Sequence, residues 1–172
     1  MGQTVIGIKP TQVALAADIT NYGSPYNFGD IGGYDDPLLG HQEFVWGRAN
    51  GAVTGAGYVC VETTGFDFQL ISITATTPGT AGPGSRVGVA MAALADNDAG
   101  WFQIYGKGTA RTLGLAAKGT RLNTTGTNGC LDDDGTAGSE QVFGIVLGTA
   151  TGGATANNSD AILTYPSVGV TL

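Results

Sequence analysis

GWFQIYGKGTARTLGLAAKGTRLNTTGTNGCL, residues 100–131, is the stretch on which the predicted fold depends. Trp101–Tyr105 alternates between apolar and polar residues as a β-strand does. Gly106 and Gly108 interrupt that run, and Thr109–Leu115 is predicted to return beside it as the second strand of a hairpin. A lone hairpin is only marginally stable in water, so other segments must cover its apolar face.

Short apolar runs of strand character lie on both sides of this stretch and are separated by Gly-rich turns. They are Glu43–Arg48, Tyr58–Glu62, Phe66–Ile73, Arg86–Leu94, Gln141–Leu147, Ala161–Tyr165 and Val168–Leu172. The best helical candidate, Gln12–Ile19, is too short to be stable alone. The pattern predicts an all-β protein, an antiparallel β-barrel or β-sandwich with an extended N-terminal arm.

The predicted arm covers residues 1–40, and residues 41–172 are predicted to form a single β domain. Within the arm, NYGSPYNFGDIGGYDDPLLG carries aromatic residues among glycines and prolines, without a clear period. Tyr22, Tyr26, Phe28 and Tyr34 need a surface on which to lie, unlike the residues of a solvated linker. We expect an arm that packs on its own domain or on a partner, with an irregular, internally packed loop as the alternative. These four residues are the candidate partner contacts.

Composition and charge narrow the class of protein. Charged residues make up only 12% of the chain, against about 25% in ordinary soluble domains. Glycine accounts for 30 of the 172 residues, against a usual share of about 7%. This composition suits a turn-rich protein whose surface is covered by neighbours in an assembly. The net charge is −7 and the seven basic residues are scattered, so neither nucleic acid nor an anionic membrane is an expected partner. No signal-peptide pattern or membrane-length apolar run occurs, which predicts synthesis in a cytoplasm.

No set of residues points to catalysis, a cofactor or a metal site. The single histidine, His41, has no nearby serine, cysteine or aspartate arranged as in a triad, and it is predicted to be structural. Asp132–Asp134 is interpreted as a solvated acidic turn, with a Ca²⁺ site as the alternative. Cys60 and Cys130 are interpreted as reduced, semi-buried thiols, although a disulfide stays open. The protein is therefore predicted not to be an enzyme.

From Gly40 to Ala150 the chain runs through GHQEFVWGRANGAVTGAGYVCVETTG, RVGVAMAAL, AGWFQIYGKGTA, NTTGTNGCLDDDG and VFGIVLGTA. This order of phrases resembles the small decoration, or cement, proteins of tailed-bacteriophage capsids. The phrases that carry the resemblance lie at Gly100–Gly106, Gly88–Ala90 and Phe143–Ile145. The resemblance implies a β-rich virion protein, commonly a homotrimer, on the capsid exterior. There it would bind the major capsid protein and tie neighbouring copies together, without catalytic residues.

A second hypothesis is an exposed carbohydrate-binding β-sandwich, such as a fibre or adhesin module. Trp46, Trp101 and Tyr105 could stack on sugar rings, and Asp132–Asp134 could hold Ca²⁺. The regular alternation of these aromatic residues along their strands argues against it, because alternation predicts that they belong to the core.

Overall fold

The computed structural model describes residues 4–77 and 79–171. Residues 1–3 of the predicted arm, and residues 78 and 172 of the predicted β domain, lie outside the described residues. The regular secondary structure of the described residues is almost wholly β-strand, with the short helix α1 (Ala16–Tyr22) near its start. The prediction of an all-β fold is confirmed. The strands are β1 (Thr4–Ile6), β2 (Val13–Ala14), β3 (Ile31–Asp36), β4 (Gly40–Ala49), β5 (Val59–Glu62), β6 (Asp67–Leu70), β7 (Val87–Ala90), β8 (Ala99–Thr112), β9 (Leu122–Thr124), β10 (Leu131–Asp132), β11 (Glu140–Leu147) and β12 (Asn157–Thr171).

The predicted hairpin in residues 101–115 is wrong, because β8 is one continuous strand of 14 residues. Gly106 has φ +95°, a conformation open chiefly to glycine, and it bends the strand without reversing it. Before the bend β8 pairs with β4, and after it β8 pairs with β12. A glycine pair that looks like a turn in the sequence is therefore the place where one strand changes its partner.

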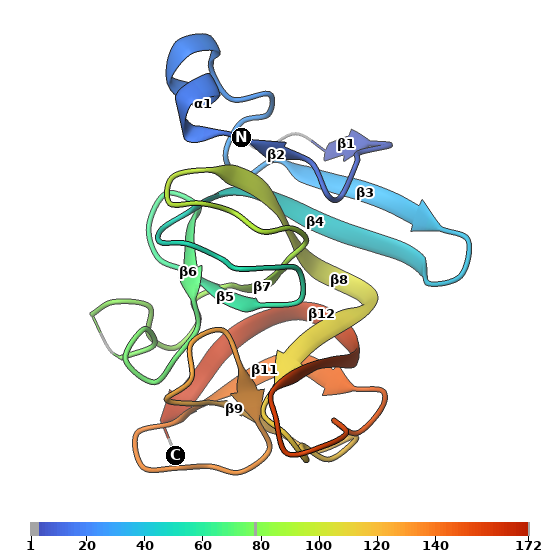
Figure 1. The fold of residues 1–172 in the computed structure, drawn as a ribbon, viewed down its shortest axis with the longest axis vertical. Coiled ribbons are helices and arrows are strands. Elements are labelled where there is room, and N and C mark those ends of the chain that lie inside the picture. The colour runs from blue at the N-terminus through green and yellow to red at the C-terminus, as the bar shows by residue number, and fades with distance from the viewer. Residues whose placement is uncertain (1–3, 78, 172) are drawn as a thin grey trace.

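Two rings of paired strands share β8 (Figure 1). The first ring runs β4–β6–β5–β7–β8 and closes through the β4–β8 pairing. The second ring runs β8–β10–β9–β11–β12 and closes through the β8–β12 pairing. The pairs β1–β3, β4–β6 and β8–β10 are parallel and the other pairs are antiparallel, so the sheet is mixed, not purely antiparallel.

Alternation along the strands divides the interior into apolar clusters. Inside the first ring, Phe68 and Phe102 stack with their ring centroids 4.2 Å apart. On the other face of β4 and β8, Trp46 and Trp101 meet edge to face at 5.0 Å. The strand β5 is apolar on both sides: Cys60 belongs to the first-ring cluster, whereas its neighbours pack toward residues of the second ring. The two rings therefore have a continuous core between them.

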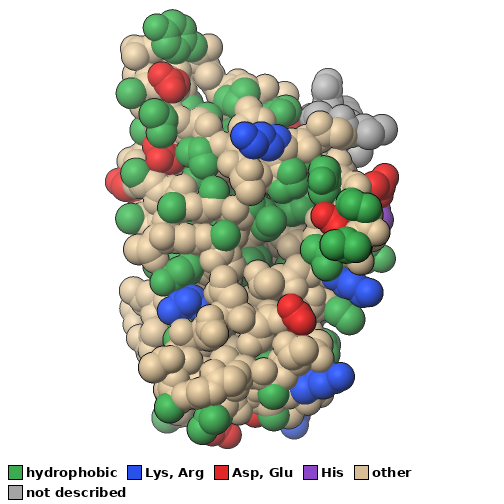
Figure 2. All heavy atoms as spheres, turned by 45° about the vertical axis from the view of Figure 1, so that its right-hand side comes forward, with side chains coloured by type: hydrophobic (Ala, Val, Ile, Leu, Met, Phe, Trp, Pro, Cys, Tyr) green, Lys and Arg blue, Asp and Glu red, His purple; other side chains and the backbone are tan. Residues whose placement is uncertain are grey.

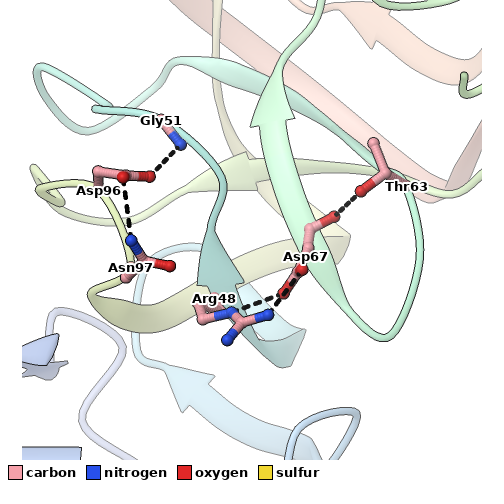
Figure 3. A network of polar contacts seen from close by, with 6 residues as sticks. All are labelled: Arg48, Gly51, Thr63, Asp67, Asp96 and Asn97. Carbon is pink, nitrogen blue, oxygen red and sulfur yellow. Dashed lines mark hydrogen bonds and ion pairs between the residues drawn. The ribbon is translucent and has the colours of Figure 1, made fainter.

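A bidentate ion pair supports the parallel β4–β6 contact that completes the first ring (Figure 3). The Nε and Nη2 atoms of Arg48 each donate to a carboxylate oxygen of Asp67 at 2.8 Å. The hydroxyl of Thr63 donates to the backbone oxygen of Asp67 at 3.2 Å. Nearby, the Asp96 carboxylate accepts hydrogen bonds from the Gly51 backbone and the Asn97 side chain. The short β4–β6 pairing has few backbone hydrogen bonds, and the side-chain contacts of Asp67 reinforce it.

The region predicted as an N-terminal arm lies against the first ring over its described residues. Strand β3 pairs with β4 as a hairpin from Ile31 opposite Val45 to Asp36 opposite Gly40, and β1 adds to the outer side of β3. The helix begins later than predicted, because Val13 is paired as a strand with Gly100 of β8. The division of the chain at residue 40 stays a prediction, although the β3–β4 hairpin crosses it.

Candidate functional site

The two rings meet at the surface where β8 changes partner. Tyr105 of β8 lies opposite Glu43 of β4 on one side and Thr164 of β12 on the other. Beneath them, the buried Gln103 amide donates to the backbone oxygens of Tyr105 and Lys107 at 3.1 and 3.0 Å. These bonds give the carbonyl groups of Tyr105 and Lys107 a buried side-chain donor on either side of Gly106. The bend is thereby held in a fixed shape, and the side chains above it are held in place.

We name the side chains gathered at this bend the junction cluster: Asp35, His41, Glu43, Tyr105 and Tyr165. Nδ1 of His41 lies 2.7 Å from a carboxylate oxygen of Asp35, and Nε2 lies 3.5 Å from Glu43. The Tyr165 hydroxyl donates to the other Glu43 oxygen at 3.0 Å. The rings of Tyr105 and Tyr165 stack with centroids 5.2 Å apart. A polar chain thus runs from β3 across β4 to β12.

The electrostatics of the cluster follow from its carboxylates. The hydrogen bond with Asp35 raises the pKa of His41, and the nearby Glu43 raises it further. The hydrogen bond to Glu43 raises the pKa of the Tyr165 hydroxyl. Tyr165 has φ +51°, which is strained for a residue with a side chain, and it is 56% exposed. Strained residues occur often at binding and switch sites, so we treat this surface as the candidate functional site.

A hollow of about 530 Å³ adjoins the junction cluster on the β3–β4 hairpin, and we name it the hairpin groove. Its lining residues are Gly7, Ile31, Gly33, Tyr34, Asp35, His41 and Glu43. A second hollow of about 360 Å³ shares Ile31 and Glu43 and continues to Tyr165 and Arg86. Figure 2 looks onto this side: hydrophobic side chains gather between acidic ones, and the purple histidine lies at the edge.

The outer face of β11 and β12 is a second surface with exposed apolar side chains. Phe143, Val146 and Ile162 are 46–47% exposed, and Val146 lies directly opposite Ile162. Their chain neighbours Ile145 and Leu163 point inward and are buried. The alternation therefore leaves apolar groups on both faces of these strands, whereas a solvated sheet face would be polar.

The four aromatic residues predicted as partner contacts do not share one surface. Tyr22 is 86% exposed at the end of α1. Tyr26 packs on both core tryptophans with centroids about 5 Å apart, and its hydroxyl donates to Gln12 at 3.1 Å. Phe28 is half-buried under the Arg48 guanidinium, and Tyr34 lines the hairpin groove. Their role as partner contacts stays a prediction.

The aromatic residues of the carbohydrate hypothesis are mostly inaccessible. Trp46 and Trp101 are at most 1% exposed, so neither ring offers a face to a sugar, whereas Tyr105 is half-exposed. Asp132 pairs in β10, and Asp133 accepts a hydrogen bond from the Ala117 backbone at 2.9 Å. Within residues 4–77 and 79–171, no group of three His, Cys, Asp or Glu side chains is placed to hold a metal ion.

Both cysteines are buried as free thiols. Burial raises the pKa of the Cys60 thiol and of the Cys130 thiol, so both stay protonated at neutral pH. The structure therefore agrees with the interpretation of Cys60 and Cys130 as reduced thiols and not with a disulfide between them.

Sequence reasoning missed the junction cluster as a group. His41 and Glu43 are two residues apart and share a strand face, which is a local signal. The contribution of Tyr165 depends on β12 lying beside β8, and nothing local to residue 165 indicates that. His41 was predicted to be structural, and the structure places it in contact with two carboxylates.

No protein-family model matches the chain, and a search of curated proteins finds no match. Among the described residues, no helix has the length and apolar character needed to cross a bilayer.

Proposed function

We propose that the protein is a virion structural protein, a decoration or cement protein on the exterior of a tailed-phage capsid. It binds the major capsid protein as a homotrimer and stabilises contacts between neighbouring capsid subunits. The order of sequence phrases from Gly40 to Ala150 supports this proposal, and so does the low charge of a chain in which 12% of residues are charged. The mechanism is binding energy and involves no chemical step.

The observation that carries the proposal is the outer face of β11 and β12. Phe143, Val146 and Ile162 each leave nearly half of their surface in water. Contiguous exposed apolar groups on a folded protein mark interaction surfaces. Covering them recovers about 25 cal/mol for each Å² of apolar surface removed from water, which suits a permanent contact in an assembly. We assign this face to contact with the shell or with another subunit of the trimer.

The experiment adds the purified protein to capsids assembled without it and measures the temperature at which the genome is released. The proposal expects a higher release temperature for decorated capsids, and light scattering should give three times the 17.3 kDa chain mass. Equal release temperatures with and without bound protein would refute the stabilising role.

A variant tests the surface itself. Ile162→Asp places a charge in the β11–β12 face, so it should lose capsid binding or trimer formation while the chain remains folded. Leu115→Asp is the matched control, because Leu115 is 71% exposed and does not belong to that face. Normal trimers and normal binding by Ile162→Asp would show that this face is not the contact.

A further inference from the structure

We propose that the hairpin groove is a second interaction surface, which binds a lysine or arginine side chain of an extended segment of a partner protein. The site differs from the β11–β12 face, and the proposal holds whether or not the partner is a capsid protein.

The groove has the dimensions of a binding site for a side chain and its flanking backbone. Its volume of about 530 Å³ lies within the range of about 300–1,000 Å³ that is common for ligand pockets. Glycines at positions 7 and 33 leave backbone exposed in its wall, and Ile31 and Tyr34 supply apolar surface. An aliphatic stem of lysine or arginine can lie along such a wall while its charged head reaches a polar rim.

The rim carries negative charge. Asp35 and Glu43 line the groove, their side chains are 85% and 27% exposed, and no lysine or arginine is among its lining residues. Arg86 of the adjoining hollow is turned to Glu62, 3.5 Å away. The whole chain carries a net charge of −7, which would also steer a basic segment toward it.

The carboxylates are arranged for an organic cation, not for a metal ion. They face the two different nitrogens of His41, so the imidazole ring separates them and they cannot share one small ion. Glu43 takes one hydrogen bond from Tyr165 and lies 3.5 Å from His41, which leaves acceptor capacity for an incoming N–H group.

His41 makes the site dependent on pH. The groups that face it are Asp35 from β3, Glu43 from its own strand and Tyr105 from β8. Protonated His41 neutralises part of the carboxylate charge and competes with an incoming cation. Binding should therefore weaken as the pH falls from about 8 to about 5, the range in which histidine titrates.

The experiment uses a seven-residue peptide in which lysine alternates with threonine, and a matched peptide in which every lysine is acetylated. Titration into the isotope-labelled full chain is followed by amide chemical shifts. We expect the lysine peptide to shift the signals of Gly33, His41 and Glu43, and the acetylated peptide to leave them unchanged. The double variant Asp35→Asn, Glu43→Gln should lose about tenfold in affinity, the scale of a charge-assisted hydrogen bond.

The control variant Asp18→Asn, Asp134→Asn removes the same net charge at exposed positions away from the groove. It should bind the lysine peptide as the unaltered chain does, and all variants should keep the same unfolding midpoint. The proposal is overturned if no peptide binds, if the acetylated peptide binds equally well, or if the control loses as much affinity as the groove variant. The last result would mean that net charge alone attracts the peptide.

Discussion

Replacing Gly106 with alanine should strain the strand that both rings share. Gly106 lies within β8 at φ +95°, where the strand leaves β4 and joins β12. A Cβ atom at this position would overlap the backbone oxygen of His41 and would lie 3.0 Å from Cα of Gln42. Both of these atoms belong to the β4 backbone, so no side-chain rotation can relieve the contact. The strands themselves must separate.

The expected cost has two parts. A positive φ costs a residue with a side chain about 1–2 kcal/mol. Forcing β4 away from β8 adds about 1–3 kcal/mol, the usual range for an overpacked interior. We therefore expect Gly106→Ala to lower the free energy of unfolding by about 2–5 kcal/mol. Domains of this kind have about 5–15 kcal/mol of stability, so the variant should still fold well enough to be measured.

Substitutions at two other glycines distinguish the cost of the positive φ from the cost of the close contact with β4. Gly51 has φ +91° with open space around its Cβ direction, so Gly51→Ala should show only the backbone cost of about 1–2 kcal/mol. Gly126 lies outside the left-handed region and also has open space, so Gly126→Ala should be neutral or stabilise by about 0.4–1 kcal/mol. Urea unfolding followed by tryptophan fluorescence measures all three. Equal losses for Gly106→Ala and Gly51→Ala, within about 0.5 kcal/mol, would refute the close approach of β4 to the bend.

Three further changes test other parts of the fold by urea unfolding. Phe102→Ala removes a side chain that is 0% exposed and should cost about 3–5 kcal/mol, so a change near zero would contradict its core position. Asp67→Asn removes the charge that Arg48 contacts at 2.8 Å, and the loss of about 1 kcal/mol should shrink with added salt; a loss independent of salt would contradict an electrostatic origin. Burial raises the pKa of Glu62 above its ordinary value of 4.5 despite the nearby Arg86, so the folded state holds this proton more tightly than the unfolded state. The resulting stabilisation is present below that value and is lost as the pH rises through the folded pKa. Glu62→Gln should remove this loss of stability above pH 4.5, and an unchanged pH dependence of the free energy of unfolding would contradict the assignment.

The strand content could be predicted from the sequence because its signals are local. The run Val59–Val61 is apolar and contains two β-branched valines, which favour a strand, and it lies in β5. The partners themselves are not local. Gly106 and Gly108 fit a turn as well as a bend. The bend forms because β12, about fifty residues later in the chain, pairs with residues 105–112. The predicted hairpin therefore failed at the level of pairing, not of strand propensity.

The predicted helix also shows pairing with a distant strand prevailing over a local preference. Gln12–Ile19 has helix-forming residues, but Val13 and Ala14 gain backbone bonds to Gly100 and Ala99 of β8. Tertiary pairing outweighs a weak intrinsic preference, so the helix begins only at Ala16. The shift moves Tyr22 from the predicted loop to the exposed end of α1.

The candidate site was harder to predict because it combines distant strands and an unusual backbone. Tyr165 precedes Pro166, and a residue before proline normally adopts an extended conformation with negative φ. Its φ of +51° places the ring over Tyr105 and the hydroxyl on Glu43. No local pattern in the sequence indicates this conformation, which the surrounding strands must impose on the residue.

The bend in β8 connects stability with binding. The first ring closes through β8 before the bend and the second ring closes through β8 after it, so neither ring keeps its closing pair if this strand moves. The junction cluster is attached to β3, β4, β8 and β12, which gives it contacts with both rings. A partner held at Glu43 would therefore resist separation of the rings as well as bind the surface. A continuous strand serves this purpose better than the predicted hairpin, because a hairpin would leave each ring with an edge of its own.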